Sequence, residues 1–330
     1  MNAQLLSRVA EHFYWFGRYI ERAENTARLI IANGNLALDL PGRARLDWYT
    51  LVETTSAQEA FASSGHNPTE PGVLRFLIAD LNNPGSILSS LRYARENLRS
   101  MRDRVPREVA ESMNVLYAVV SERSDGAIRR TSARFDLLRG VMDHCQIVRG
   151  YLAGTMSRGL GYRFIRSGQV LERADMTTRI MDVRVEDLLP DDHELPAVAD
   201  ALQWMAVLRS LSAYQMYRRH KPGAIKARHV IDFLLQDESF PRSVYSALSQ
   251  FRDHAGQLPQ PQDVLGAVDA ALGDVSSLRA AVLSADNARL HTTLDQLQVT
   301  LLNVHAAMDR SYFDPQPMEM AATQTQKQSG

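Results

Sequence analysis

Two short stretches of this 330-residue chain carry the same pattern of carboxylate and guanidinium side chains, at residues 13–31 and 164–181. A shift of 151 residues aligns their glutamates and arginines, and it places an aspartate of the second stretch on a glutamate of the first. The aligned charged positions are Glu21, Arg22, Glu24 and Arg28, and then Glu172, Arg173, Asp175 and Arg179. Such groups can form ion pairs, bind a charged ligand or, with shifted pKa values, carry out acid–base chemistry.

If each stretch forms a helix, its carboxylates and its last arginine lie on one face. Glu21 and Arg28 are seven residues apart, and Glu24 lies four residues before Arg28. A solvated ion pair at this spacing stabilises a helix by only about 0.2–0.5 kcal/mol. This small stabilisation does not explain why the charges recur in both stretches. We therefore expect the two charged faces to be buried against each other or to line a shared groove. Their charges then fix the geometry of the interface, which we favour, or bind a ligand or partner group.

A second group of arginines follows one face of another expected helix. Spacings of three, four and three residues align the guanidinium groups of Arg92, Arg95, Arg99 and Arg102. The usual explanation of such a stripe is a solvated helix face, and the alternative is a surface for an anion or a carboxylate-bearing partner. A nucleic-acid partner is not expected, because the formal net charge of the chain is −1.

Motifs for catalysis and metal binding are missing from the sequence. No glutamate has a histidine three residues later, and no His-Glu-x-x-His sequence occurs, so the known helical metal motifs are not met. The Gly-rich residues 154–161 lack the Lys-Ser/Thr of a phosphate-binding loop. His144 and Cys145 are neighbours, but adjacent helical residues point about 100° apart and cannot chelate alone. The sequence predicts no catalytic residue, no metal site and no cofactor.

The hydrophobic pattern places the charged residues on helices. Apolar residues recur at a period near 3.6, and no segment alternates convincingly at period 2. A first helix is expected after Ser7, with Asn33-Gly34 as its stop signal. Further helices are expected at about residues 47–61, 73–80, 86–104, 107–123, 128–157, 264–283 and 286–312, with a connector at 252–263. The sequence therefore predicts an all-α fold, a helical bundle.

Two other blocks recur in the same order, which predicts an internal duplication. Residues 48–61 match residues 204–217 at an offset of 156, and the Phe-Leu block at 76–77 matches 233–234 at an offset of 157. The second of these blocks ends in Pro-x-Ser in both copies, a pattern typical of a loop that leads into a helix. We expect one multi-helix half at residues 1–160, a second at 161–314, and a polar, disordered tail at 315–330.

Composition adds expectations about the cellular setting. Cys145 is the single cysteine, so a disulfide framework is excluded and a reducing compartment is favoured. Charged residues interrupt the first 20 positions, so neither a signal peptide nor a membrane-spanning helix is expected. The sequence predicts a cytoplasmic protein that does not contact a membrane.

Several of these blocks closely resemble the bacterial alpha-E domain family. The resemblance is carried by LSRVAE at residues 6–11, YWFGRY and ERAENTAR within residues 14–28, and LERADMTTR at residues 171–179. Residues 94–97 and 233–243 are also similar to family blocks. The resemblance implies an all-helical protein that accompanies a circularly permuted ATP-grasp ligase, often with a transglutaminase-like protein nearby.

By this resemblance, the chain is expected to be a non-catalytic accessory subunit of an ATP-grasp amide ligase system. The repeated Glu/Arg residues would hold the two halves in register or frame a groove for a partner or substrate. The alternative, from another functional class, is an enzyme whose glutamates do acid–base work on a peptide or amine substrate.

Overall fold

The computed structural model describes residues 7–39, 47–186, 196–279 and 286–314 of the chain. Within these ranges it contains fourteen α-helices, one short π-helical segment and no β-strand. The all-α prediction is therefore confirmed. No helix in these ranges has both the length and the apolar character needed to cross a membrane.

The helices differ widely in length, and the longest three are α1, α8 and α7. Up to residue 155 the helices are α1 (Ser7–Asp39), α2 (Thr50–Thr54), α3 (Gln58–Ser63), α4 (Glu70–Ile78), α5 (Ile87–Ser100), α6 (Arg107–Arg129) and α7 (Thr131–Thr155). From residue 160 they are α8 (Leu160–Glu186), α9 (Pro196–Ser210), α10 (Tyr214–His220), α11 (Ala227–Gln236), α12 (Val244–Ala255), α13 (Gln262–Ser277), α15 (Asn287–Met308) and the π-helical η1 (Asp309–Phe313).

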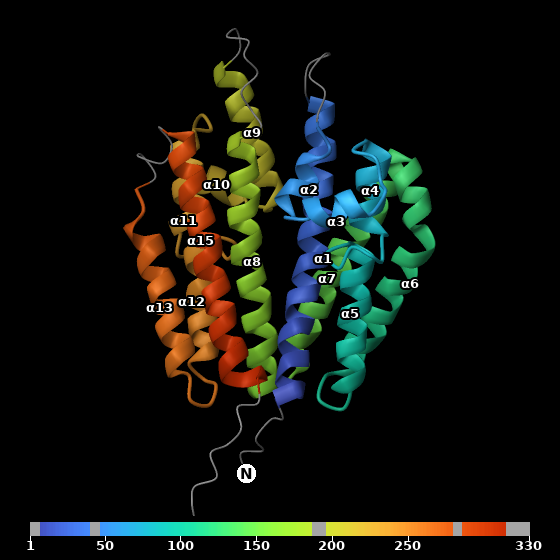
Figure 1. Cartoon of the computed structure of the whole chain (residues 1–330), viewed down its shortest axis with the longest axis vertical. Helices are drawn as coiled ribbons and strands as arrows, with labels where there is room; N and C mark the ends of the chain where they lie inside the picture. Colours follow the sequence, from blue (N-terminus) through green and yellow to red (C-terminus); the bar gives the residue numbers. More distant parts are fainter. Residues whose placement is uncertain (1–6, 40–46, 187–195, 280–285, 315–330) are drawn as a thin grey trace, which may run out of the picture.

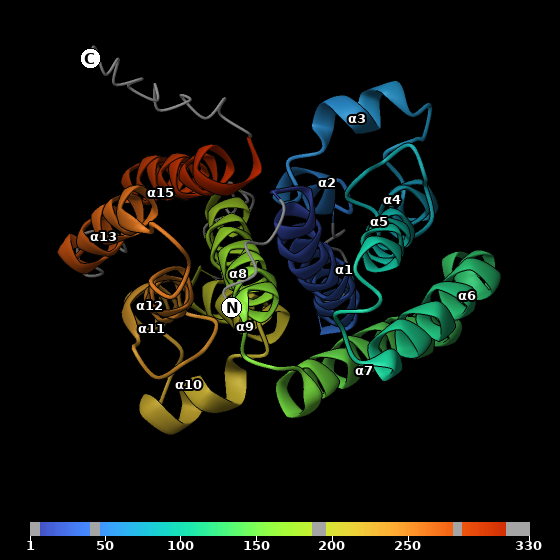
Figure 2. The ribbon, with the colours of Figure 1, turned by 90° about the horizontal axis from the view of Figure 1, so that it is seen from below.

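Helices α1 and α8, which carry the two repeated stretches, lie side by side at the centre and run in the same direction (Figure 1). Seen from below, α5 and α7 flank α1 on one side of the molecule, and α12 and α15 flank α8 on the other (Figure 2). Three further contacts cross this division, because α9 and η1 also pack on α1, and α2 also packs on α8. The two charged stretches thus lie in the interior of the bundle, between these flanking helices.

Two glycines allow α1 and α8 to approach closely. A Cβ atom on Gly17 would lie 2.1 Å from the carbonyl oxygen of Ile165, and one on Gly168 would lie 2.1 Å from that of Tyr14. These positions are equivalent under the 151-residue shift, so the close contact is reciprocal. Any side chain there would push the two backbones apart.

Some expected helix limits were wrong, for local reasons. α1 continues past Asn33-Gly34, because Gly34 packs against the ring of Phe135, whose Cζ would be 3.2 Å from an added Cβ. The expected helix at 47–61 is two helices, since Ser56 has a φ of 50° and interrupts them. Ser212 does the same between α9 and α10 with a φ of 52°.

Other limits differ by several residues. α5 ends at Ser100 instead of 104, α6 continues to Arg129, α13 ends at Ser277, and part of the expected connector at 252–263 is helical as the end of α12. The Pro-x-Ser prediction is confirmed, because the side chains of Ser86 and Ser243 cap α5 and α12 by accepting from the backbone NH groups of Ser89 and Ser246. The predicted tail at 315–330 lies outside the described residues.

Candidate functional site

The glutamate and arginine at the start of each repeated motif form ion pairs with the opposite helix. Arg22 of α1 donates from Nε and Nη2 to the two oxygens of Glu172 on α8, at 2.6 and 3.0 Å. Arg173 of α8 donates in the same way to Glu21 of α1, at 2.9 Å for both bonds. Both pairs are bidentate, the strongest arrangement of an arginine with a carboxylate. The repeated Glu-Arg pair therefore acts as a reciprocal clamp between the two central helices.

The later charges of each motif form a second reciprocal set. Arg28 donates to Glu24 one helical turn earlier, at 2.8 Å, and Arg179 donates to Asp175 at 3.0 Å. Each arginine also reaches across the molecule, since Arg28 hydrogen-bonds Ser212 and Arg179 hydrogen-bonds Ser56. These are the two serines whose positive φ interrupts the helices on either side. The motif thus also fixes the turns between α2 and α3 and between α9 and α10.

The carboxylates of α1 lie in a densely packed group of arginines, which we call the Glu21 cluster: Glu21, Glu24, Arg28, Arg149, Arg173 and Arg242. Arg149 of α7 contacts Glu21 at 2.5 Å and also pairs with Glu24. Arg242, from the loop before α12, donates to Glu21 at 3.0 Å and to Glu24 at 2.9 Å. Both glutamates are 0% exposed. This half of the site is closed.

The carboxylates of α8 have fewer partners, in what we call the Glu172 cluster: Arg18, Arg22, Glu172, Asp175 and Arg179. Glu172 is 2% exposed and pairs with Arg18 at 2.5 Å as well as with Arg22. Among the described residues, Asp175 forms an ion pair with Arg179 alone, whereas Glu24 at the equivalent position has three arginine partners. The side chains of Asp175 and Arg179 remain 19% and 24% exposed. This half of the site is open.

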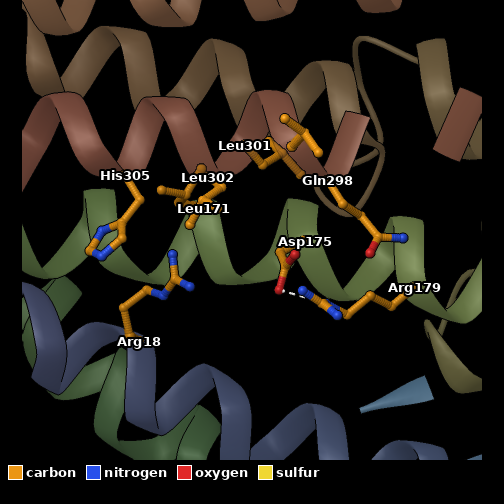
Figure 3. A pocket seen from close by; sticks show the side chains of 9 residues that line it. Arg18, Leu171, Asp175, Arg179, Gln298, Leu301, Leu302 and His305 are labelled. Atoms are coloured by element: carbon orange, nitrogen blue, oxygen red, sulfur yellow. Dashed lines mark hydrogen bonds and ion pairs between the residues drawn. The ribbon is translucent and has the colours of Figure 1, made fainter. Parts of the chain in front are cut away.

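Two cavities flank the Asp175–Arg179 pair, one on each side. The first, the α15 cavity, has a volume of about 220 Å³ and lies between α8 and α15, with Arg18, Asp175 and Arg179 at its α1-facing side and Gln298, Leu302 and His305 on α15 (Figure 3). The second, the Gly85 cavity, has a volume of about 320 Å³. Its lining includes Arg22, Thr26, Ser56, Asn83, Gly85, Glu172, Asp175, Met176 and Arg179.

The buried glutamates are held in their charged form. Burial raises the pKa of Glu21, but the charges of Arg149, Arg173 and Arg242 outweigh this and hold it well below the usual range. The pKa of Glu24 is lowered for the same reason, with burial opposed chiefly by Arg149. Burial likewise opposes ionisation of Glu172, and Arg18 and Arg22 lower its pKa. All three side chains are carboxylates at neutral pH.

The four arginines of the second predicted group, Arg92, Arg95, Arg99 and Arg102, have different surroundings. Arg92 stacks on Tyr93, with its guanidinium carbon 4.9 Å from the ring centre, and Arg95 donates to Asn114 of α6 at 2.8 Å. Arg99 is exposed near the end of α5. Arg102 is exposed in the turn after Ser100 and so does not continue the helical stripe.

Arg18, Arg149 and Arg242 complete the two clusters and were not predicted from the sequence. Arg242 could have been found by comparing the two Pro-x-Ser blocks, because it stands where the first block has Gly85. Arg149 had no such signal, since it lies on α7 outside any repeated block. Cys145 on α7 is buried against α1, and burial raises the pKa of its thiol.

One group of possible metal ligands occurs among the described residues. Asp182, His291 and Asp295 could each offer one ligand atom, and these atoms lie within 4.8 Å of one another. Asp182 and His291 already hydrogen-bond each other at 2.6 Å, which satisfies the donor–acceptor pair without an ion. The sequence predicted no metal site, because the Glu-x-x-His motif does not cover ligands on separate helices such as Asp182 and His291.

Residues 5–313 match the Alpha-E family, described as "a predicted alpha-helical domain with a conserved ER motif". The chain belongs to this family, and the Glu-Arg pairs at 21–22 and 172–173 are the two ER sequences that form the reciprocal clamp.

The curated relatives are distant and longer. The chain is 22% identical to uncharacterised proteins of Mycobacterium bovis and Mycobacterium tuberculosis over 91% of its length. It spans only 35% of the length of these relatives. No solved structure matches the chain.

Proposed function

We propose that the chain is a non-catalytic helical binding subunit, built from two duplicated halves, that serves a circularly permuted ATP-grasp amide ligase system. The observation that carries this proposal is the contrast between a closed and an open charge cluster. The Glu21 cluster is filled by arginines of the chain itself, and the Glu172 cluster keeps two cavities beside Asp175. The first then holds the fold together, and the second offers charged groups to a partner or substrate.

The duplication is supported by the reciprocity of the contacts. The Gly17 and Gly168 contacts, the two bidentate Glu-Arg pairs and the two arginine–serine contacts each occur twice, with the roles of the halves exchanged. Three reciprocal pairs of contacts of this kind are expected if an ancestral unit paired with its own copy, because a two-fold interface uses the same surface patch on both units.

A non-catalytic role is supported by the ionisation state of the glutamates. A general base or acid works best when its pKa lies near the operating pH. The pKa values of Glu21, Glu24 and Glu172 are instead lowered by the arginines that touch them. Carboxylates held in this way are weak bases and have no proton to give at neutral pH. This disfavours the alternative in which the repeated motif is an acid–base active site.

The ATP-grasp partner, and a transglutaminase-like protein as a further one, follow from the Alpha-E family resemblance. The test measures binding of the purified chain to a circularly permuted ATP-grasp protein by isothermal titration calorimetry, and then ATP turnover of that protein with candidate acid and amine substrates. We expect binding and faster turnover with the wild type. We expect a weaker effect with Asp175→Asn, and an unchanged effect with the exposed control Glu122→Gln. No binding and no change in turnover would overturn the proposed partnership.

A further inference from the structure

The loops before α5 and α12 occupy equivalent places but differ at one residue. The first reads Pro84-Gly85-Ser86 and the second Pro241-Arg242-Ser243, and in both the serine caps the helix that follows. The first loop faces the Glu172 cluster, where Gly85 lines a cavity together with Glu172 and Asp175. The second faces the Glu21 cluster. The same loop position therefore carries an arginine side chain in the second half, at Arg242, and no side chain in the first half, at Gly85.

Arg242 shows which chemical group the carboxylates of the Glu21 cluster bind at this loop position. Its guanidinium donates to Glu21 at 3.0 Å, to Glu24 at 2.9 Å and to the side-chain oxygen of Asn25 at 2.9 Å. The side chain is 9% exposed, so it is almost completely surrounded by these acceptors and the neighbouring arginines. A guanidinium group is thus accepted between the carboxylates of one motif.

The equivalent acceptors in the Gly85 cavity are present and under-used. Glu172 and Asp175 stand where Arg242 meets Glu21 and Glu24, and Asp175 has a single arginine partner. Thr26 is 0% exposed and lines the cavity, and its hydroxyl has no hydrogen-bond partner among the described residues. The equivalent hydroxyl of Thr177 donates to the backbone carbonyls of Arg173 and Arg242. An unpartnered buried hydroxyl destabilises the protein, and a bound ligand that hydrogen-bonds it would remove this penalty.

Net charge alone would favour an anion, because three arginines face two carboxylates in the Glu172 cluster. The Glu21 cluster nevertheless binds a guanidinium group despite its excess of arginines. There, four arginines face two carboxylates, and the guanidinium of Arg242 is still held by three hydrogen bonds. In both clusters the shared carboxylates hold the arginines together, since each carboxylate can accept about four hydrogen bonds.

We propose that the Gly85 cavity binds a guanidinium group, the side chain of an arginine carried by a ligand or by a partner protein, between Glu172 and Asp175. The side chain enters the space that Arg242 fills in the other half, and Thr26 and Asn83 supply further polar contacts. This inference rests on the duplication and the binding role proposed above, and it names the chemical class that the open cluster recognises.

The first test fills the cavity from within by the variant Gly85→Arg. The backbone of Gly85 does not have a positive φ, and an added Cβ meets only the side-chain oxygen of Asn83 at 3.3 Å, so the loop accepts a larger residue. We expect a higher midpoint of urea denaturation than for the wild type. We expect no such increase for Gly85→Met, which has a side chain of similar reach and no charge. A crystal structure of Gly85→Arg in which the new side chain points into solvent would overturn the proposal.

The second test measures binding of small probes to the isolated chain by calorimetry. N-acetyl-arginine amide is expected to bind, N-acetyl-lysine amide more weakly, and N-acetyl-glutamate amide not at all. Gly85→Arg and Asp175→Asn are each expected to weaken binding of the arginine probe at least tenfold, and Glu122→Gln is expected to leave its affinity unchanged. Preference for the glutamate probe, or equal binding to wild type and Gly85→Arg, would contradict the proposal.

Two further arms separate the possible sources and the possible failures. An arginine-containing pentapeptide that binds at least tenfold more tightly than the amide probe would indicate a partner segment, and equal affinity would indicate a small molecule; both support a guanidinium site. Because the probes are measured without any ligase, binding of the ligase without binding of the arginine probe overturns this inference alone. Binding of the probe without binding of the ligase overturns the ATP-grasp partnership alone.

Discussion

The variant Glu21→Gln tests the buried charge cluster most severely, because it removes one negative charge and almost no volume. Glu21 is 0% exposed and accepts from Arg149 at 2.5 Å, Arg173 at 2.9 Å and Arg242 at 3.0 Å. Removing one partner of a buried ion pair costs about 3–5 kcal/mol, because the remaining charge is left without compensation. Three arginines share the loss here, so we expect a value within this range, a large part of the 5–15 kcal/mol by which a typical domain is stable.

The measurement is the free energy of unfolding from urea denaturation, followed by circular dichroism. The matched control is Glu122→Gln on the exposed side of α6, where we expect a change within about 0.5 kcal/mol. A loss below about 1 kcal/mol for Glu21→Gln would refute the reasoning, since it would mean that the arginines do not depend on this carboxylate.

The same pair of proteins gives a pH dependence whose sign can be worked out. The pKa of Glu21 is lower in the folded protein than the value of about 4.3 expected in the unfolded chain. Its contribution is therefore complete above about pH 4.3 and is lost as the pH falls through the folded-state pKa. The difference in unfolding free energy between wild type and Glu21→Gln should be constant near neutral pH and should shrink below about pH 4. A difference that grows on acidification would contradict this assignment.

Further variants test other parts of the structure. Gly17→Ala and Gly168→Ala should each destabilise the protein by about 1–3 kcal/mol or more, because the added methyl group overpacks the contact between α1 and α8. The control Gly150→Ala, exposed on α7 with nothing near its Cβ, should stabilise the protein by up to about 1 kcal/mol. Equal effects of the three variants in urea denaturation would contradict the close contact between α1 and α8. Glu172→Gln should lower the free energy of unfolding by less than Glu21→Gln does, because it leaves two arginines unpaired instead of three and Arg22 is 25% exposed. Burial, with the nearby arginines, lowers the pKa of His254 to about 4, so protonation of this histidine opposes folding and the free energy of unfolding should fall as the pH drops from about 6.5 to 4. His254→Gln should reduce this loss of stability, and the same pH dependence of stability in the variant and the wild type would contradict the prediction.

The sequence was sufficient for the helical class and for the pairing of the two motifs. Apolar residues at a period of 3.6 define helices whatever their partners are, and charges that recur at one offset indicate a shared environment. The order of the interactions was less accessible. Glu24 and Arg28 are four residues apart and their pair could be expected, whereas Arg149 reaches Glu21 from a helix 128 residues away that carries no repeated pattern. Only the packing of α7 on α1 brings those two residues together.

Helix ends were predicted poorly where tertiary contacts override local signals. Gly34 is a stop signal in isolation, but packing against Phe135 keeps α1 continuous to Asp39. Ser56 carries no strong turn signal, and its positive φ is held by contacts such as its hydrogen bond from Arg179. The open half of the site was missed for a related reason: Gly85 is informative only when its counterpart Arg242 is seen among the carboxylates.

The two Glu-Arg motifs clamp α1 to α8, and a double-mutant cycle on Arg22 and Glu172 tests this clamp most directly. The four proteins are the wild type, Arg22→Gln, Glu172→Gln and the double variant, and the quantity is the coupling free energy from urea denaturation. The bidentate contact at 2.6 and 3.0 Å predicts a coupling of about 1.5–3 kcal/mol. A coupling below about 0.5 kcal/mol, the size expected for residues that do not touch, would contradict the proposed clamp between α1 and α8.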